Sequence, residues 1–424
     1  MFTSVGLNVV TVCLSIVQTC GFVEIPAVIP VRRCWSCSNG ATTGLAQLGC
    51  VAADALEADP PELKALEFYS GIGGLRMSLE KAAETTSLNT SVRSYEINDV
   101  ANSVYEHNFP GCTVTRRSIE HLSSQDLDGA ADIWLLSPPC QPFCRIGKQM
   151  DEDDNRSVSF LHLLSILKGA EDPPDLFFLE NVRGFEGSHA HQRLLEVLTL
   201  RGFRVEQYLL SPVHLGIPNT RLRYFCLASR CSVEGEGEVG PIQESLPCHM
   251  SAMSPASSER VPGQEKVHVR PLSEYLDQSM VGGVAVPLLL SPKAASYANP
   301  SLRFDVATRR STETTTFTKG YGKHAGRAGP VLLLTDDGER RVSEEDLGRF
   351  PSGLDLGPQG RQLRWFSDRE MLRLHGFPER FEFPAGLSLR QRFGLVGNSV
   401  NVEVVALLLR RLLLLQAGLK GGAL

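Results

Sequence analysis

A cysteine held between prolines is the residue of this chain best suited to covalent chemistry. It lies in the run Ser137-Pro-Pro-Cys140-Gln-Pro-Phe143, directly after the apolar stretch 131–136. Prolines restrict the backbone on both sides of the cysteine and so aim one side chain in one direction. A cysteine thiolate is the strongest nucleophile among side chains near neutral pH. We therefore interpret Cys140 as a nucleophile; the alternative is a proline-rich turn in which a small apolar cysteine only fills space.

An acid and two arginines could assist that nucleophile. Glu180 follows the apolar stretch 176–179, where its carboxyl group could give a proton or a hydrogen bond to the N3 edge of a cytosine. Arg221 and Arg223 are spaced i, i+2 before another apolar stretch, so on a strand they share one face and could line one cleft. The predicted catalytic group is Cys140, Glu180, Arg221 and Arg223.

A glycine-rich turn and a second acid predict an adenosyl cofactor. The turn Phe68-Tyr-Ser-Gly71-Ile-Gly73-Gly74 follows one predicted strand and opens a predicted helix. Glycines there let the backbone approach a ligand closely, and the N-terminus of the helix favours a polar or anionic group. Glu96 follows the next predicted strand, where a carboxylate can accept hydrogen bonds from both ribose hydroxyls of such a cofactor. By itself, Glu96 would be interpreted as a surface acid.

The composition is that of an ordinary globular chain with a slight acidic excess. Of its 424 residues 42% are hydrophobic and 21% are charged, and the formal net charge is −6. No globally basic surface is therefore expected, and any contact with nucleic acid must come from a local patch.

Several classes of protein are disfavoured by the sequence. The 11 cysteines are too few and too irregularly spaced for a disulfide framework, and the pair Cys34 and Cys37 lacks the second pair that a structural zinc site needs. We expect no metal site. No uncharged apolar run reaches the roughly 20 residues of a membrane-spanning helix. Residues 1–23 have no basic segment, so we do not expect a signal peptide.

Strand-like and helix-like patterns alternate from Leu63 onward. The predicted strands are 64–69, 91–95, 131–136, 176–179 and 223–228, and the predicted helices are 75–80, 160–167 and 191–200. This alternation is typical of a parallel, doubly wound α/β sheet with ligands at the carboxyl ends of its strands. The turn 396–399 precedes the apolar stretch 406–415, which we interpret as a buried final helix. That helix must pack back on the first domain if the turn is to join the site.

Two later segments differ in composition from the rest. Residues 232–265 are rich in Ser, Pro, Gly and Glu, and we interpret them as a flexible linker or insertion. Residues 301–330 hold six basic and two acidic side chains with interleaved aromatics, a pattern that suits contact with nucleic-acid backbone and bases, although a solvated face is the plainer interpretation. The predicted contacts are Arg309, Arg310, Lys319, Tyr321 and Lys323.

The boundaries of the predicted regions follow from these changes. We expect a poorly ordered extension at 1–62, the first part of the catalytic domain at 63–231, the linker at 232–265, a small recognition region at 266–365 and a C-terminal part at 366–424 that packs back on the catalytic domain.

Together and in this order, the motifs resemble those of the cytosine-C5 methyltransferase family from about Leu63 to Leu415. Four stretches resemble the branch of that family that methylates tRNA: Ser157–His162, Leu215–Phe225, Phe317–Gly322 and Leu374–Pro378. The resemblance implies a Rossmann-like, S-adenosylmethionine-dependent methyltransferase domain with a smaller inserted recognition region. It implies transfer of a methyl group to a cytosine in the anticodon loop of tRNA, with tRNA(Asp) favoured over other tRNAs and weak or no action on DNA.

The resemblance also carries residue roles. Cys140 would add to C6 of the cytosine, Glu180 would act at N3, and Arg223 with Arg221 would hold the base and stabilise negative charge. The cofactor would be held by Phe68, Ser70, Gly71, Ile72, Gly73, Gly74, Glu96, Ile97, Ile119, Glu120, Ser137, Asn398 and Ser399, with Ile119 stacked on the adenine. A cytoplasmic and nuclear monomer without a membrane partner is expected.

The chain departs from the branch at one position. Thr316 precedes Phe317-Thr where the branch has cysteine, which leaves the local geometry and the level of activity open. Two alternatives therefore remain: a DNA cytosine-C5 methyltransferase, which shares every catalytic motif, and a catalytically weak relative that only binds nucleic acid. An exocyclic-amine methyltransferase would need an aromatic residue where this chain has Cys140.

Overall fold

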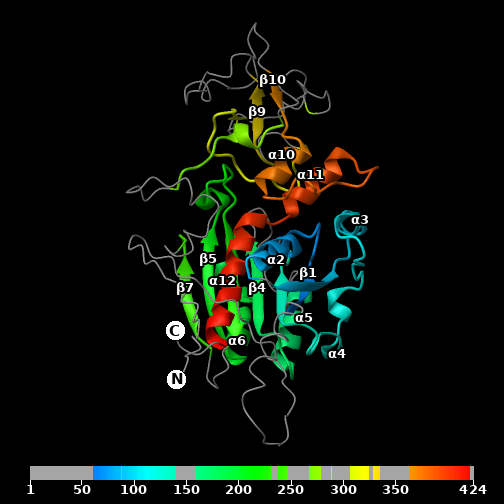
Figure 1. Ribbon diagram of the computed structural model, residues 1–424, viewed down its shortest axis with the longest axis vertical. Helices are drawn as coiled ribbons and strands as arrows, with labels where there is room; N and C mark the ends of the chain where they lie inside the picture. The colour runs from blue at the N-terminus through cyan, green and yellow to red at the C-terminus, as the bar shows by residue number, and fades with distance from the viewer. Residues whose placement is uncertain are drawn as a thin grey trace, which may run out of the picture.

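A seven-stranded sheet with helices on both faces supports the catalytic part of the chain (Figure 1). The computed structural model describes residues 61–86, 88–139, 158–230, 237–246, 267–277, 288, 306–323, 328–334 and 362–420. The strands lie in the order β2-β1-β3-β4-β6-β5-β7. They are β1 (Glu62–Phe68), β2 (Asn89–Tyr95), β3 (Ile133–Leu136), β4 (Leu176–Val182), β5 (Phe203–Leu210), β6 (Arg223–Arg230) and β7 (Val239–Gln243).

The helices form two layers because the central strands are apolar on both faces. One face packs on α2 (Gly74–Glu84) and α12 (Val402–Lys420), which cross in front of the sheet in Figure 1. The other face packs on α5 (Val158–Gly169) and α6 (His189–Leu200). The short α4 (Ser124–Leu127) contacts α5, and α3 (Asp99–Asn108) follows β2. The predicted doubly wound α/β fold is confirmed, including the final helix that packs back on the sheet.

The sequence had predicted a wholly parallel sheet, but the sheet is mixed. Strand β6 runs antiparallel to both β4 and β5. The connection from β5 to β6 holds only a short 3-10 helix, Pro212–Leu215, and no α-helical crossover. Parallel neighbours need a long crossover, so this connection returns the chain antiparallel.

The segment predicted as a flexible linker contributes the edge strand of the sheet. Its described part, 237–246, contains β7, which pairs parallel with β5 and carries Pro241 within it. An edge strand tolerates proline because one side of its backbone needs no partner. The prediction of a linker was therefore wrong for these residues, since composition alone does not reveal backbone pairing.

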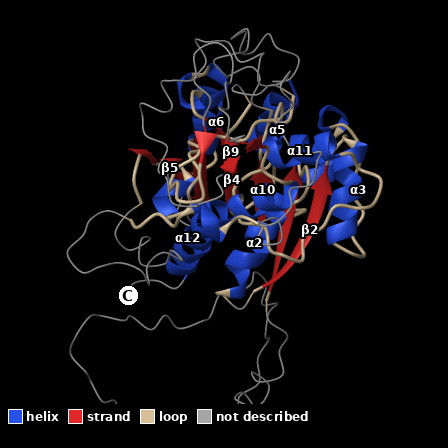
Figure 2. Ribbon diagram, turned by 90° about the horizontal axis from the view of Figure 1, so that it is seen from above, coloured by secondary structure: helices blue, strands red, loops and turns tan. Residues whose placement is uncertain are grey.

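A second core joins the recognition region to part of the C-terminal segment. A three-stranded sheet is formed by β8 (Val306–Ala307), β9 (Val331–Leu334) and β10 (Gln362–Arg364), and it packs with α10 (Asp368–Leu374) and α11 (Leu389–Asn398). In Figure 1 these elements lie above the large sheet, and Figure 2 shows the same arrangement from above. Residues 368–398 thus pack with the recognition region, whereas Val400 and the chain from Val404 onward pack on the catalytic sheet, and Val402 belongs to the second core.

A buried carboxylate supports the start of α2. Glu67 of β1 is 0% exposed; it accepts hydrogen bonds from the backbone N–H of Arg76 at 3.0 Å and from the hydroxyl of Tyr105 at 2.8 Å. The side chain of Ser94 also donates to it, at 3.3 Å. Burial raises the pKa of Glu67 from 4.5 to about 7, although these hydrogen bonds and the nearby Arg76 act in the opposite direction. Glu67 thereby ties β1 to the helix that follows the glycine-rich turn.

We predict that Glu67→Gln changes how stability depends on pH. The folded chain holds the Glu67 proton up to about pH 7, whereas the unfolded chain loses it near 4.5. Between these two pKa values the free energy of unfolding of the wild-type chain therefore falls by about 3 kcal/mol, and the glutamine variant does not show this loss. Urea unfolding should show that the free energy of unfolding of the variant increases relative to that of the wild type as the pH rises from 4.5 to 8. Glu62→Gln, at an exposed position of the same strand, is the control; a pH-independent difference between Glu67→Gln and wild type would contradict the prediction.

Candidate active site

The strand register places four site positions side by side. Phe68 lies opposite Tyr95 of β2 and Leu136 of β3, and Leu136 lies opposite Leu179 of β4. The next residue of each strand or turn therefore reaches the same carboxyl edge of the sheet. These residues are Tyr69, Glu96, Ser137 and Glu180. The motifs that the sequence predicted to act together are brought to one edge by this alignment.

The glycine-rich turn winds through left-handed backbone conformations. Tyr69, Gly71 and Gly73 have φ of 59°, 52° and 88°, and Tyr69 is the non-glycine residue of the described chain with positive φ. A side chain at Gly73 would collide with the ring of Phe109, whereas the space beside Gly71 is open, with only the Tyr69 carbonyl oxygen 4.0 Å away. The turn is thus closely packed on one side and open at Gly71, where a ligand can approach the backbone.

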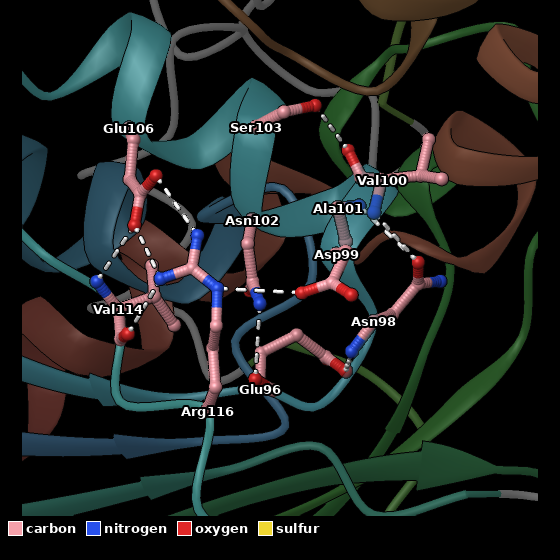
Figure 3. Close-up of polar contacts among 10 residues, drawn as sticks. All are labelled: Glu96, Asn98, Asp99, Val100, Ala101, Asn102, Ser103, Glu106, Val114 and Arg116. Carbon is pink, nitrogen blue, oxygen red and sulfur yellow. Dashed lines mark hydrogen bonds and ion pairs between the residues drawn. The ribbon is translucent and has the colours of Figure 1, made fainter.

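The carboxylate of Glu96 is held in place by the backbone (Figure 3). Its two oxygens accept hydrogen bonds from the N–H groups of Gly71 at 3.1 Å and Asn98 at 2.9 Å. The buried Asn102 donates its side-chain amide to the Glu96 carbonyl oxygen at 3.1 Å. Each carboxylate oxygen keeps a further lone pair, so Glu96 is oriented to accept two more hydrogen bonds from a pair of hydroxyls.

Arg116 stabilises the opposite side of the turn that contains Glu96. Its guanidinium contacts Asp99 at 3.3 Å and Glu106 at 3.1 Å, both on α3. Glu106 in turn accepts from the backbone N–H of Val114 at 3.2 Å, as Figure 3 shows. Backbone hydrogen bonds between Thr115 and the end of β2 complete the connection. The chain that leads to Ile119 is therefore fixed against Glu96.

Around Glu96 the side chains fit an adenosyl group. Ile97 is 68% exposed directly beside the acid and offers apolar surface, and Glu120 is also exposed. Ile119, which we expected to stack on adenine, packs into the core and is only 7% exposed. The hydroxyl of Ser70 is buried without a hydrogen-bond partner next to the turn. An unpaired buried hydroxyl and an open, pre-oriented carboxylate are what a polar nucleoside cofactor would satisfy.

The other predicted cofactor residues divide into two groups. Phe68 and Ile72 are buried at 0% and 2% exposure, so their side chains support the turn from the core. Ser137 donates its hydroxyl to the Tyr69 carbonyl at 3.2 Å. The C-terminal segment reaches the same place: a side chain at Gly74 would meet the Ser399 hydroxyl at 2.8 Å, and Asn398 is exposed beside it. In the structure residues 398–399 lie beside the glycine-rich turn, as predicted.

Glu180 and Arg223 form an ion pair on one face of the sheet. The Arg223 guanidinium lies 3.3 Å from the Glu180 carboxylate, and the two side chains are 16% and 11% exposed. Burial raises the pKa of Glu180 above its usual value, and the charges of Arg223 and Arg221 partly oppose that shift. A raised pKa increases the fraction of Glu180 that carries a proton near neutral pH. This is the state needed to donate to a ring nitrogen.

The sequence had predicted that Arg221 and Arg223 line one open cleft, but in the structure they do not. The side chain of Arg221 is 4% exposed and donates to the carbonyl oxygens of Phe317 at 3.1 Å, Gly397 at 3.3 Å and Ser399 at 2.6 Å. Because its donors are directed at backbone oxygens, Arg221 connects three segments of chain rather than facing a substrate. It is a positioning residue in this structure.

A buried histidine beside the two arginines was not predicted from the sequence. His375 is fully buried, and its Nδ1 donates to the Met371 carbonyl at 2.8 Å. Burial and the charges of Arg221 and Arg223 lower its pKa to about 3. It therefore stays neutral and adds no third positive charge to the cluster. The stretch 374–378 was recognised from sequence, but nothing in it indicated this role.

Three of the five predicted nucleic-acid contacts are exposed. Arg310, Lys319 and Lys323 are exposed, and Arg309 is half-buried. Tyr321 is 0% exposed; its hydroxyl donates to Pro330 at 2.8 Å and accepts from the N–H of Phe366 at 2.9 Å. The tyrosine packs in the core of the recognition region and cannot stack on a base from there. A spacing that suits stacking is equally typical of a core position.

Cys140 lies outside the described residues, which stop at Pro139 before resuming at Val158. The proposed nucleophile thus rests on its sequence context and on the placement of β3, which directs the chain to the same edge as Glu96 and Glu180. Among the described residues there is no cluster of possible metal ligands. Within that part of the chain, no helix is long and apolar enough to cross a membrane.

Comparisons with known proteins point to one family. Residues 63–413 match the family model for C-5 cytosine-specific DNA methylases. The chain is 34% identical to a tRNA (cytosine(38)-C(5))-methyltransferase of Mus musculus, covering 82% of this chain and 92% of that protein. It is 32% identical to a DNA (cytosine-5)-methyltransferase of Dictyostelium discoideum, with 82% and 94% covered. The crystal structure of the S. pombe Dnmt2 methyltransferase superposes with a TM-score of 0.67 at 29% identity, over 83% of this chain and 98% of that one.

We predict that Glu96→Ala weakens binding of S-adenosylhomocysteine by about tenfold or more, because hydrogen bonds to a charged acceptor contribute about 1.5–3 kcal/mol each. Titration calorimetry would measure the dissociation constant. Glu84→Ala is the control, since Glu84 is an exposed acid at the end of α2 with no role in the site. Equal affinity in Glu96→Ala and wild type would remove the assignment of Glu96.

Proposed function

Because the chain belongs to the C-5 cytosine-specific DNA methylase family, we propose that it methylates C5 of a cytosine in the anticodon loop of tRNA. The observation that carries the chemistry is the Glu180–Arg223 pair, which lies on the same edge of the sheet as the glycine-rich turn and Glu96. Support for RNA comes from the mouse relative, whose name specifies cytosine 38 of tRNA. We propose the equivalent cytosine of tRNA(Asp) as the favoured substrate.

Each residue has a separate role in the proposed reaction. The thiolate of Cys140 adds to C6, which forms a carbon–sulfur bond and moves an electron pair toward C5. Glu180 gives a proton or hydrogen bond at N3, and Arg223 keeps that carboxyl group in position. S-adenosylmethionine would supply the methyl group that C5 accepts, leaving S-adenosylhomocysteine as the second product. Loss of the C5 proton to a base then returns the electron pair to the ring and expels the Cys140 thiolate.

The exposed cations of the recognition region support contact with an RNA backbone. Arg310, Lys319 and Lys323 are exposed on a chain whose formal net charge is −6, so they are available as local positive charges for an RNA backbone although the chain is not basic as a whole. Such contacts position a folded anticodon arm by its shape, which suits a small recognition region.

The second candidate is a DNA cytosine-C5 methyltransferase. The relative from Dictyostelium discoideum carries that name and is nearly as similar as the mouse protein. The two candidates share the cofactor site and the catalytic residues, so only the substrate distinguishes them.

We predict methyl transfer from labelled S-adenosylmethionine to total tRNA and to purified tRNA(Asp), and little or none to duplex DNA. Cys140→Ala should abolish transfer while S-adenosylhomocysteine still binds, because the covalent step needs the thiolate. Scintillation counting of each nucleic acid measures the product. Label in DNA alone would favour the second candidate, and label persisting in Cys140→Ala would contradict the covalent scheme.

We predict that Glu180→Gln lowers kcat by about 10²-fold, the usual size of a general-acid contribution. The KM for tRNA should change much less, because the amide keeps the size and hydrogen-bonding capacity of the acid. Steady-state kinetics with tRNA(Asp) measures both constants. Glu196→Gln, an exposed acid on α6, is the control. A wild-type kcat in Glu180→Gln would remove its assigned role.

A further inference from the structure

A ladder of hydrogen bonds joins the recognition region to the chain that enters β6. We define the recognition segment as residues 313–323. The N–H of Thr220 donates to the carbonyl oxygen of Thr314 at 2.7 Å, and the hydroxyl of Thr316 donates to the carbonyl oxygen of Thr220 at 2.7 Å. The Thr220 hydroxyl donates to the Glu313 carboxylate at 2.7 Å. Thr220 is thus held through its N–H, its carbonyl and its side chain.

The preceding residue extends the ladder. Asn219, 0% exposed, donates its side-chain amide to the hydroxyl of Thr314 at 3.1 Å and to the carbonyl of Thr315 at 3.0 Å. The Thr314 hydroxyl donates to the carbonyl of Pro218 at 2.8 Å. A one-residue shift of either segment of this ladder would break several of these hydrogen bonds at once, so together the bonds define one register.

The ladder continues into the catalytic site. Thr316 contacts Thr220, and the next residues in each segment, Phe317 and Arg221, also contact each other. Two residues further on, Arg223 meets Glu180, while in the recognition segment Lys319 is exposed. Arg223, the partner of the proposed acid, and the exposed Lys319 thus follow the same end of the ladder, each three residues beyond the Thr220–Thr316 contact.

We propose that Thr316 is a positioning residue whose hydroxyl fixes the register of the recognition segment on the chain that enters β6, and so sets the RNA-binding surface relative to Glu180 and Arg223. This inference rests on the proposed function and adds a residue that determines how the RNA is presented. A hydroxyl is a stronger donor than a thiol, so threonine holds the Thr220 carbonyl more firmly than the cysteine of similar size would.

Three substitutions at this position separate the hydroxyl from the rest of the side chain. Thr316→Val keeps the shape and removes the donor, Thr316→Ser keeps the donor and removes the methyl group, and Thr316→Cys substitutes a weaker donor. Thr312→Val is the matched control, since Thr312 is an exposed threonine of the preceding chain.

The first measurement is hydrogen–deuterium exchange of the full chain without RNA, in peptides covering 214–222 and 311–321. The Thr220 amide donates to Thr314, and we expect it to exchange about tenfold faster in Thr316→Val, because loss of the neighbouring Thr316–Thr220 hydrogen bond loosens the register that holds it. Thr316→Ser should exchange as the wild type does, and Thr316→Cys should fall between them. Wild-type exchange in Thr316→Val, or equal acceleration in Thr312→Val, would overturn the proposal.

The second measurement separates positioning from general destabilisation. In Thr316→Val, kcat/KM for tRNA should fall about tenfold, while the affinity for S-adenosylhomocysteine stays within about twofold of wild type. Thr316→Ser should recover the wild-type value. If serine and valine reduce kcat/KM equally, or if cofactor affinity falls in parallel, the hydroxyl does not position RNA.

Failure of the proposed function gives a different result from failure of this inference. If the wild-type chain transfers no methyl group to tRNA, the proposed substrate is wrong. If the wild-type chain methylates tRNA and Thr316→Val does so equally well with unchanged exchange, the role of Thr316 is wrong.

Discussion

A buried guanidinium holds the parts of the active site together. Arg221 directs its donors at carbonyl oxygens of the recognition segment and of the C-terminal turn, and it does so from the chain that enters β6. Removing a charged group from water is unfavourable unless its hydrogen bonds are replaced. These carbonyls replace them only when all three segments are in place. Formation of the site is therefore coupled to the packing of segments that lie 96, 176 and 178 residues from Arg221 in the sequence.

The register of the sheet supplies the second constraint. Phe68, Tyr95, Leu136 and Leu179 are aligned across neighbouring parallel strands, so the residues after them reach the edge at the same level. The antiparallel β6 then delivers Arg223 to that edge from the opposite direction, next to Val182 and within reach of Glu180. A wholly parallel sheet would have placed the start of β6 at the far edge. The departure from the predicted topology is thus what brings arginine and acid together.

Local patterns in the sequence predicted the elements and the turn well, and they failed where the result depends on long-range packing. Strands β1, β2, β3, β4 and β6 and the glycine-rich turn follow from periodicity and from glycine chemistry, which act over a few residues, whereas β5 and β7 were not predicted. By contrast, Tyr321 was assigned to RNA and is buried, and Arg221 was assigned to substrate and binds backbone. For Ile119 and Ile97, only the folded chain shows which isoleucine is exposed. The residue types were compatible with either environment.

The charges around Glu180 explain why the neutral state of His375 matters. Two arginines close to one acid would ordinarily favour the ionised carboxylate and lower its pKa. Burial outweighs them here and raises the pKa of Glu180. A protonated His375 would add a third cation to the same cluster and shift the balance toward ionised Glu180, but burial and the arginines lower its pKa to about 3. Burial of His375 therefore keeps a third positive charge out of the cluster, which agrees with the raised pKa of Glu180.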